Sequence, residues 1–220
     1  MAGMTDHRPD THDMILVHRV YRREFALAPS LIRDVEPGDH RRAAELAVHI
    51  DTLLVGLHRH HRTEDELLWP KLRERVRIDG LLVDRMTDQH VRVAQLIDGL
   101  GVPLAAWRIS PEVVRRERLA RLLTELALEL TAHLDDEEQL ILPLAAEHLS
   151  VEEWDQLGKH GMAGLPQDRL LMALGAILED ADQDERAAFL AKLPVPVQLV
   201  WRQIGAIGYE RTMARIRAAA

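Results

Sequence analysis

The chain contains no cysteine, which excludes both a disulfide framework and a metal site built on thiolates. Aromatic residues make up only 4% of its 220 residues, so the core must consist mainly of Leu, Val, Ile and Ala. No apolar run is long enough to span a membrane, and residues 1–13 lack the apolar segment of a signal peptide. The net charge of −8 provides no general basic face for nucleic-acid phosphates. We therefore expect a cytoplasmic protein that binds neither nucleic acids nor membranes.

Abundant Leu, Ala, Arg and Glu favour helices, and the alternating β-branched runs typical of strands are nearly absent. Apolar residues recur at intervals of three and four, as on the inward faces of a helical bundle. Helices are predicted over residues 11–28, 40–69, 81–100 and 111–142. Asp39 is expected to cap the second helix, with loops at Pro29, Asp79-Gly80 and Gly101. The predicted fold class is all-α, an up-down-up-down four-helix bundle over residues 11–148.

Residues 150–220 follow the bundle and have their own helical pattern. Ser150 and Glu153 form the sequence pattern of a capping box, which predicts a short helix. Further helices are predicted over residues 167–179, 183–192 and about 197–217. We expect this region to be a helical extension that packs on the bundle.

Two segments of the chain repeat one pattern: a His, a carboxylate four residues later, and an apolar run that ends in Pro. The pairs are His60 with Glu64 and His133 with Glu137. Positions i and i+4 lie one above the other on a helix, so each pair can offer an imidazole nitrogen and a carboxylate oxygen to one site. This arrangement is typical of metal ligation.

A second repeat surrounds the first, because His18 precedes His60 by 42 residues and His90 precedes His133 by 43. The chain thus reads as two helical hairpins, each with a single His on its first helix and a His-x3-Glu pair on its second. All six polar residues fall on the apolar seam, where an unpaired carboxylate is costly to bury. The candidate metal ligands are His18, His60, Glu64, His90, His133 and Glu137.

Six nitrogen and oxygen donors exceed the four that a structural zinc takes, and they suit two ions bridged by the carboxylates. Imidazole with carboxylate favours iron, with manganese and zinc as alternatives. A ferritin-like site would require Glu-x-x-His, which the chain lacks. A buried hydrogen-bond network without metal is the competing interpretation, although it would bury two carboxylates without a cation.

Other polar residues near these positions are interpreted differently. His61 lies one step around the helix from His60 and is expected at a helix interface or in solvent, with a place in the site as the alternative. Asp65 and Glu138 are expected to be flanking charges. Tyr21 lies on the inward stripe, either as a core residue or as a partner of the metal site. Two residues of the extension would reach the site only if that region folded over it: His160 and Tyr209.

With these motifs the chain resembles the haemerythrin-like, or HHE cation-binding, family over residues 11–148. The resemblance implies a non-haem di-iron centre, with the four histidines as terminal ligands, the two glutamates as bridges, and an oxo or hydroxo bridge between the irons. The extension is similar to those of some bacterial members.

The pattern departs from the oxygen-carrying members in two ways. Their third helix has two histidines spaced by four, whereas here the positions four residues before and after His90 are Met86 and Ala94. Their fourth-helix carboxylate is an Asp five residues after the His, whereas here it is Glu137, four residues after His133. The resemblance therefore implies binding of, or reaction with, O2, peroxide or nitric oxide, including catalase-like turnover, rather than reversible oxygen carriage. The alternative is an iron- or oxygen-responsive regulatory module without turnover, and the sequence leaves open whether the protein is an enzyme.

Overall fold

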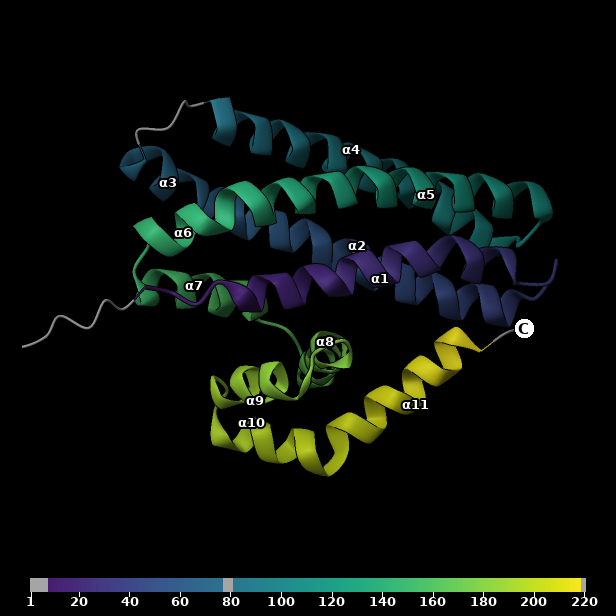
Figure 1. The fold of residues 1–220 in the computed structure, drawn as a ribbon. Helices are drawn as coiled ribbons and strands as arrows, with labels where there is room; N and C mark the ends of the chain where they lie inside the picture. The colour runs from purple at the N-terminus through teal and green to yellow at the C-terminus, as the bar shows by residue number, and fades with distance from the viewer. Residues whose placement is uncertain (1–7, 77–80, 219–220) are drawn as a thin grey trace, which may run out of the picture.

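The computed structural model describes residues 8–76 and 81–218, which form helices and their connections without a strand. Four long helices make the bundle (Figure 1). They are α1 (His12–Arg33), α2 (His40–Leu67), α4 (Leu81–Ile109) and α5 (Val113–Asp136). Short helical segments continue the second and fourth of these: α3 (Trp69–Arg75), the π-helical turn η1 (Glu137–Ile141) and α6 (Leu142–His148).

The four long helices alternate in direction along the bundle, as the sequence predicts. Helix α1 packs against α2 and α5, and α4 packs against the other sides of the same two helices (Figure 1). Each long helix therefore has two neighbours, and all four inward faces meet along one axis. This confirms the predicted up-down-up-down bundle.

Two predicted helix ends are wrong, because helices continue through their prolines. Helix α1 contains Pro29, and α4 runs past Gly101 and Pro103 to Ile109. A proline in a helix loses one backbone hydrogen bond. The residues beyond it are deeply buried in both cases, with Ile32 and Trp107 each at 0% exposure, so apolar burial offsets that loss.

Other predicted boundaries agree with the structure. Asp39 caps α2 by accepting a hydrogen bond from the backbone N–H of Arg42 at 2.9 Å. Helix α2 ends at Leu67, and α3 begins with Pro70 in its first turn, where a proline is tolerated. The predicted turn at Asp79-Gly80 lies outside the described residues.

The apolar core is divided into two clusters along the bundle axis. The larger one contains Leu57 and Leu130, and the smaller one, at the end near α3 and α6, contains Leu68, Met86 and Ile141. The two His-x3-Glu pairs follow Leu57 and Leu130 in the sequence and precede Leu68 and Ile141. The candidate ligands therefore lie in a polar layer between two apolar clusters.

The extension consists of α7 (Val151–Met162), α8 (Gln167–Glu179), α9 (Gln183–Ala191), α10 (Val195–Val200), the π-helical turn η2 (Trp201–Gly205) and α11 (Ala206–Arg217). The predicted capping box of Ser150 and Glu153 is present at the start of α7. Helices α7 and α11 contact α2, and α8 contacts α1 (Figure 1). Leu178 and Met213 join the larger core cluster, so the extension packs directly on the bundle.

No helix in the described part of the chain combines the length and the apolar character that a membrane span requires.

Candidate metal centre

The bundle brings seven His and Glu side chains into one buried layer. They are His18 of α1, His60, His61 and Glu64 of α2, His90 of α4, His133 of α5 and Glu137 of η1. Six of them are between 0% and 5% exposed. The side chain of His60 is the most accessible of the set, at 9%. All six sequence-predicted residues are therefore together, and a seventh joins them.

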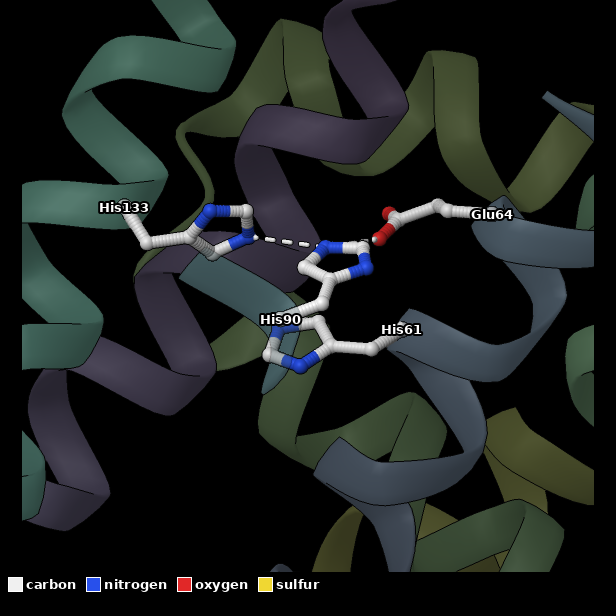
Figure 2. A group of neighbouring side chains, drawn as sticks. All are labelled: His61, Glu64, His90 and His133. Carbon is white, nitrogen blue, oxygen red and sulfur yellow. Dashed lines mark hydrogen bonds and ion pairs between the residues drawn. The ribbon is translucent and has the colours of Figure 1, made fainter. Parts of the chain in front are cut away.

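The seven side chains form two groups that share Glu64. One group, which we call the His61 subsite, comprises His61, Glu64, His90 and His133 (Figure 2). The other, the His18 subsite, comprises His18, His60, Glu64 and Glu137. Within each group the potential ligand atoms all lie within 4.8 Å of one another, which is the spacing of donors around one ion.

The two carboxylates each face histidines of both subsites. The Oε1 atom of Glu64 lies 3.2 Å from Nε2 of His60, and its Oε2 atom lies 3.5 Å from Nε2 of His90. The Oε2 atom of Glu137 lies 3.5 Å from Nε2 of His18 and 3.6 Å from Nε2 of His133. Both carboxylates are thus placed where they could bridge two ions.

Three of the histidines are oriented by acceptors on their outer side. The Nδ1–H group of His18 donates to Glu138 at 2.9 Å. The Nδ1–H group of His90 donates to Asp65 at 2.8 Å, and that of His133 donates to Gln89 at 3.2 Å. A neutral imidazole has one proton, so these bonds leave each Nε2 with a free lone pair directed inward. Such outer hydrogen bonds are typical of metal-ligating histidines.

The inward atoms of this layer lack partners within the protein. Nine buried side-chain N and O atoms of the described residues have no hydrogen-bond partner, and seven of them belong to this layer. They are Nε2 of His18, His60 and His61 and both carboxylate oxygens of Glu64 and Glu137. In addition, Nε2 of His90 and of His133 face each other at 3.2 Å. Because buried polar atoms are normally satisfied, this donor set fits bound cations.

Burial determines the protonation states of these groups in the metal-free protein. Burial, reinforced by the neighbouring imidazoles, lowers the pKa values of His60 and His61 well below the usual range of histidine. The same causes lower the pKa of His133 to about 2. These imidazoles are therefore neutral and able to act as donors. Burial, together with the nearby Glu137 carboxylate, raises the pKa of Glu64. A cation in the layer would compensate the negative charges of the two buried carboxylates.

The placement of His61 corrects the sequence-based interpretation. The sequence favours a helix interface or solvent for this residue, but it is only 5% exposed, and its ring stacks on that of His90 with centroids 4.2 Å apart. Helix α2 has α1 on one side and α4 on the other, so adjacent residues of α2 can enter different subsites. The layer therefore contains five imidazoles rather than four, which weakens the sequence-based argument against oxygen carriage.

The residues interpreted as flanking charges, Asp65 and Glu138, instead orient His90 and His18 from outside. Tyr21 is buried at the edge of the layer, with its ring centroid 5.3 Å from that of His60. The two extension residues do not reach the layer. His160 pairs with Glu66 at 3.3 Å, and the hydroxyl of Tyr209 donates to Glu179.

We predict that His61→Ala weakens the binding of one metal ion by at least about tenfold and leaves the second ion bound, because only the His61 subsite loses a donor. His58→Ala provides the matched control, since His58 is exposed one turn earlier on α2. Competition with a coloured chelator would resolve the two binding steps. Equal affinities in both variants and the wild type would show that His61 is not a ligand.

A helical bundle that buries five imidazoles and two carboxylates with unpartnered donor atoms defines a metal-binding protein. Comparison with family models agrees, since residues 10–150 match the hemerythrin HHE cation binding domain. The chain therefore belongs to the hemerythrin HHE family, as its motifs indicate. No curated protein and no solved structure shows a significant match to the chain.

Proposed function

We propose that the layer holds two non-haem irons, one in each subsite, and that this centre binds or reacts with O2, peroxide or nitric oxide. The observation that supports this proposal best is the set of unpartnered inward atoms, which is divided into two subsites that share Glu64. Glu64 and Glu137 would bridge the ions, and the five histidines would complete the ligand set. Iron would supply redox chemistry that imidazole and carboxylate groups lack.

The types of donor support iron as the metal. Imidazole and carboxylate without thiolate suit non-haem iron, which commonly keeps open positions when few protein ligands hold it. With both carboxylates bridging, the His18 subsite would have four protein donors and the His61 subsite five. Both numbers are below the six of an octahedral ion, so a position remains for an external ligand. The His18 subsite has two imidazoles and two carboxylates, whereas the His61 subsite has three imidazoles and, besides the bridging Glu137, one carboxylate.

The burial of the layer restricts what can react there. Its side chains are almost completely enclosed, so only a molecule of a few atoms can reach an open coordination position. The least enclosed side chains are His60 and Tyr21, each at 9%. A small ligand would therefore approach the His18 subsite beside Tyr21. The Nδ1 proton of His18 stays on the outer side, where Glu138 accepts it.

The proposal is tested by loading the protein with ferrous iron without oxygen and adding O2, peroxide or nitric oxide separately. We expect an optical change with nitric oxide, and peroxide decay that releases one O2 for every two peroxide molecules consumed. Because the two anionic carboxylates favour the harder ferric ion, air should oxidise the reduced protein to a ferric form that vacuum does not reverse. Loaded protein that is optically silent toward all three would contradict the proposal. An oxygenated spectrum that vacuum reverses through several cycles would instead identify oxygen storage.

A second candidate function is an iron- or oxygen-responsive module without turnover. The observation that favours it is the attachment of the extension to α1, the helix that also provides His18. Peroxide decay distinguishes the two, because a responsive module would bind its ligand and consume at most a stoichiometric amount of peroxide.

A further inference from the structure

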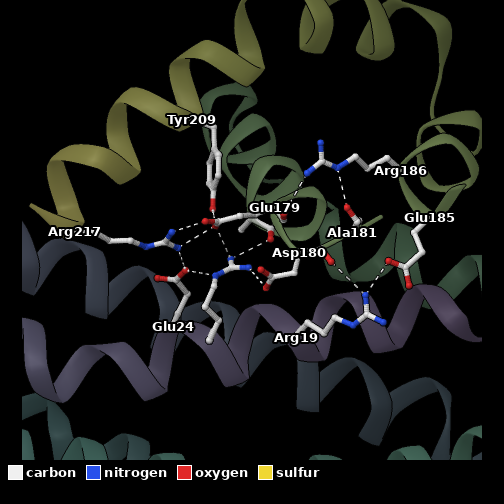
Figure 3. Close-up of polar contacts among 11 residues, drawn as sticks. Arg19, Glu24, Glu179, Asp180, Ala181, Glu185, Arg186, Tyr209 and Arg217 are labelled. Carbon is white, nitrogen blue, oxygen red and sulfur yellow. Dashed lines mark hydrogen bonds and ion pairs between the residues drawn. The ribbon is translucent and has the colours of Figure 1, made fainter. Parts of the chain in front are cut away.

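A closed ring of four charged side chains joins the extension to α1 (Figure 3). Arg23 of α1 donates to Glu24 at 2.9 Å and lies 3.2 Å from Glu179 of α8. Arg217 of α11 donates to Glu24 at 2.6 Å and to Glu179 at 3.0 Å. The two arginines and two glutamates therefore alternate around the ring, and each charge is paired with two of the opposite sign.

Glu24 is the most deeply buried member of this ring. Its side chain is only 2% exposed, and it also faces His49 of α2 at 3.2 Å. Burial alone would raise the pKa of Glu24, but the hydrogen bonds from His49 and Arg23 and the charges of Arg217 and Arg23 lower it to about 2. Glu24 is thus ionised in the folded protein, and it depends on Arg217 of the extension for part of its compensation.

Further contacts fix the position of α11 against the bundle. Arg42 of α2 donates to the backbone carbonyls of Ile216 and Ala218 at 2.6 and 2.8 Å, and so satisfies the C-terminal end of α11. Helix α11 also crosses α8 closely at Gly175, where an added Cβ would lie 2.3 Å from the ring of Tyr209. Only glycine therefore fits at this position of α8 while α11 lies this close.

The helix that receives the ring is also the helix that provides His18. Glu24 lies six positions after His18, which corresponds to about 9 Å along a helix. Arg22, next to the ring residue Arg23, donates at 2.6 Å to Glu138, which in turn accepts the Nδ1 proton of His18. Helix α1 thus connects the charge ring on its outer face to a candidate ligand on its inner face.

We propose that the extension is a clamp on α1, so that docking of α8–α11 and occupancy of the His18 subsite stabilise each other. The proposal rests on the metal centre proposed above. The clamp holds α1 in the position that directs His18 to its ion, and an ion bound by His18 holds α1 where the ring can close. Linkage makes the effect reciprocal: each event strengthens the other by the same factor.

The first test replaces Arg217 with Met, which removes the charge but keeps a long side chain. Arg211→Met is the matched control, because Arg211 is exposed on the same helix. Ferrous iron is titrated into each protein under anaerobic conditions against a coloured chelator. We expect Arg217→Met to weaken one binding step about tenfold, within the usual range of coupling energies. His18→Ala and His61→Ala, which each remove a donor from one subsite, identify the weakened step, and it should be that of the His18 subsite.

The second test needs no substitution. Hydrogen exchange of the wild-type amides is compared with and without iron, and we expect iron to slow exchange in α8 and α11 as well as in α1. Wild-type protein that binds two ions but shows unchanged exchange in α8 and α11, or Arg217→Met with both affinities unchanged, would overturn the clamp alone. Wild-type protein that binds no iron would overturn the proposed centre as well.

Discussion

Removal of iron should lower the melting temperature of the protein by about 10 °C. Ligands that bind only the folded state stabilise it by about 4 kcal/mol when the free ligand exceeds its dissociation constant about 1,000-fold. In a domain of this size, each kcal/mol shifts the melting temperature by about 2–4 °C. The structure gives a specific reason for the loss, because the metal-free layer keeps Glu64 and Glu137 buried with unpartnered oxygens.

This prediction is checked by melting curves of iron-loaded and chelator-treated protein, followed by a third curve after iron is restored. The third curve controls for damage by the chelator and should return to the first. Coincident curves for the loaded and treated protein would show that the metal contributes nothing to the stability of the fold.

Replacing Glu137 with Ala should abolish stable binding of at least one iron, whereas Glu138→Ala should leave both in place at saturating iron. The two residues are adjacent, but their surroundings differ. Glu137 is 0% exposed, and its Oε2 atom faces the inward nitrogens of His18 and His133. Glu138 lies outside the layer, where it accepts from His18 and Arg22.

Loss of Glu138 removes only an outer hydrogen bond to a ligand, and such changes typically weaken metal binding by about 10–100-fold. Iron bound per chain at saturating iron, together with the visible spectrum, separates the two variants. Each serves as the control for the other, since both remove one carboxylate from the same turn. If Glu138→Ala lost its iron and Glu137→Ala kept its full spectrum, the carboxylate ligand would be Glu138 and not Glu137.

The sequence predicts the bundle well because its signals are local and repeated. Apolar spacing identifies the four long helices, Asp39 marks the start of α2, and the two His-x3-Glu pairs place four donors at one level. The doubling of the hairpin then adds His18 and His90 by their matching separations. These residues meet because inward positions of antiparallel helices at one level of a bundle share a common axis.

Features that depend on neighbours in three dimensions are not predictable from the sequence. Adjacent residues on a helix point about 100° apart, which favours a position outside the site for His61. However, α2 lies between α1 and α4 and directs His60 and His61 to different subsites. One signal was available, since His61 and Glu64 have the i,i+3 spacing of residues on one face. The π-helical turn at Glu137 and the continuation of α1 through Pro29 depend on tertiary packing, which the local sequence pattern does not predict.

The sequence alone also does not predict how the extension is attached to the bundle. Its helices could be predicted from caps and apolar spacing, but the ring that attaches them joins residues of α1 to residues more than 150 positions later. Such pairings become visible only once the fold brings the charges together.

Metal analysis of protein expressed with added iron tests the central claim most directly. The two subsites predict two irons per chain. Protein from which the iron has been removed should again bind two irons per chain after anaerobic loading. A single tightly bound zinc per chain, with no iron retained after loading, would contradict the di-iron centre.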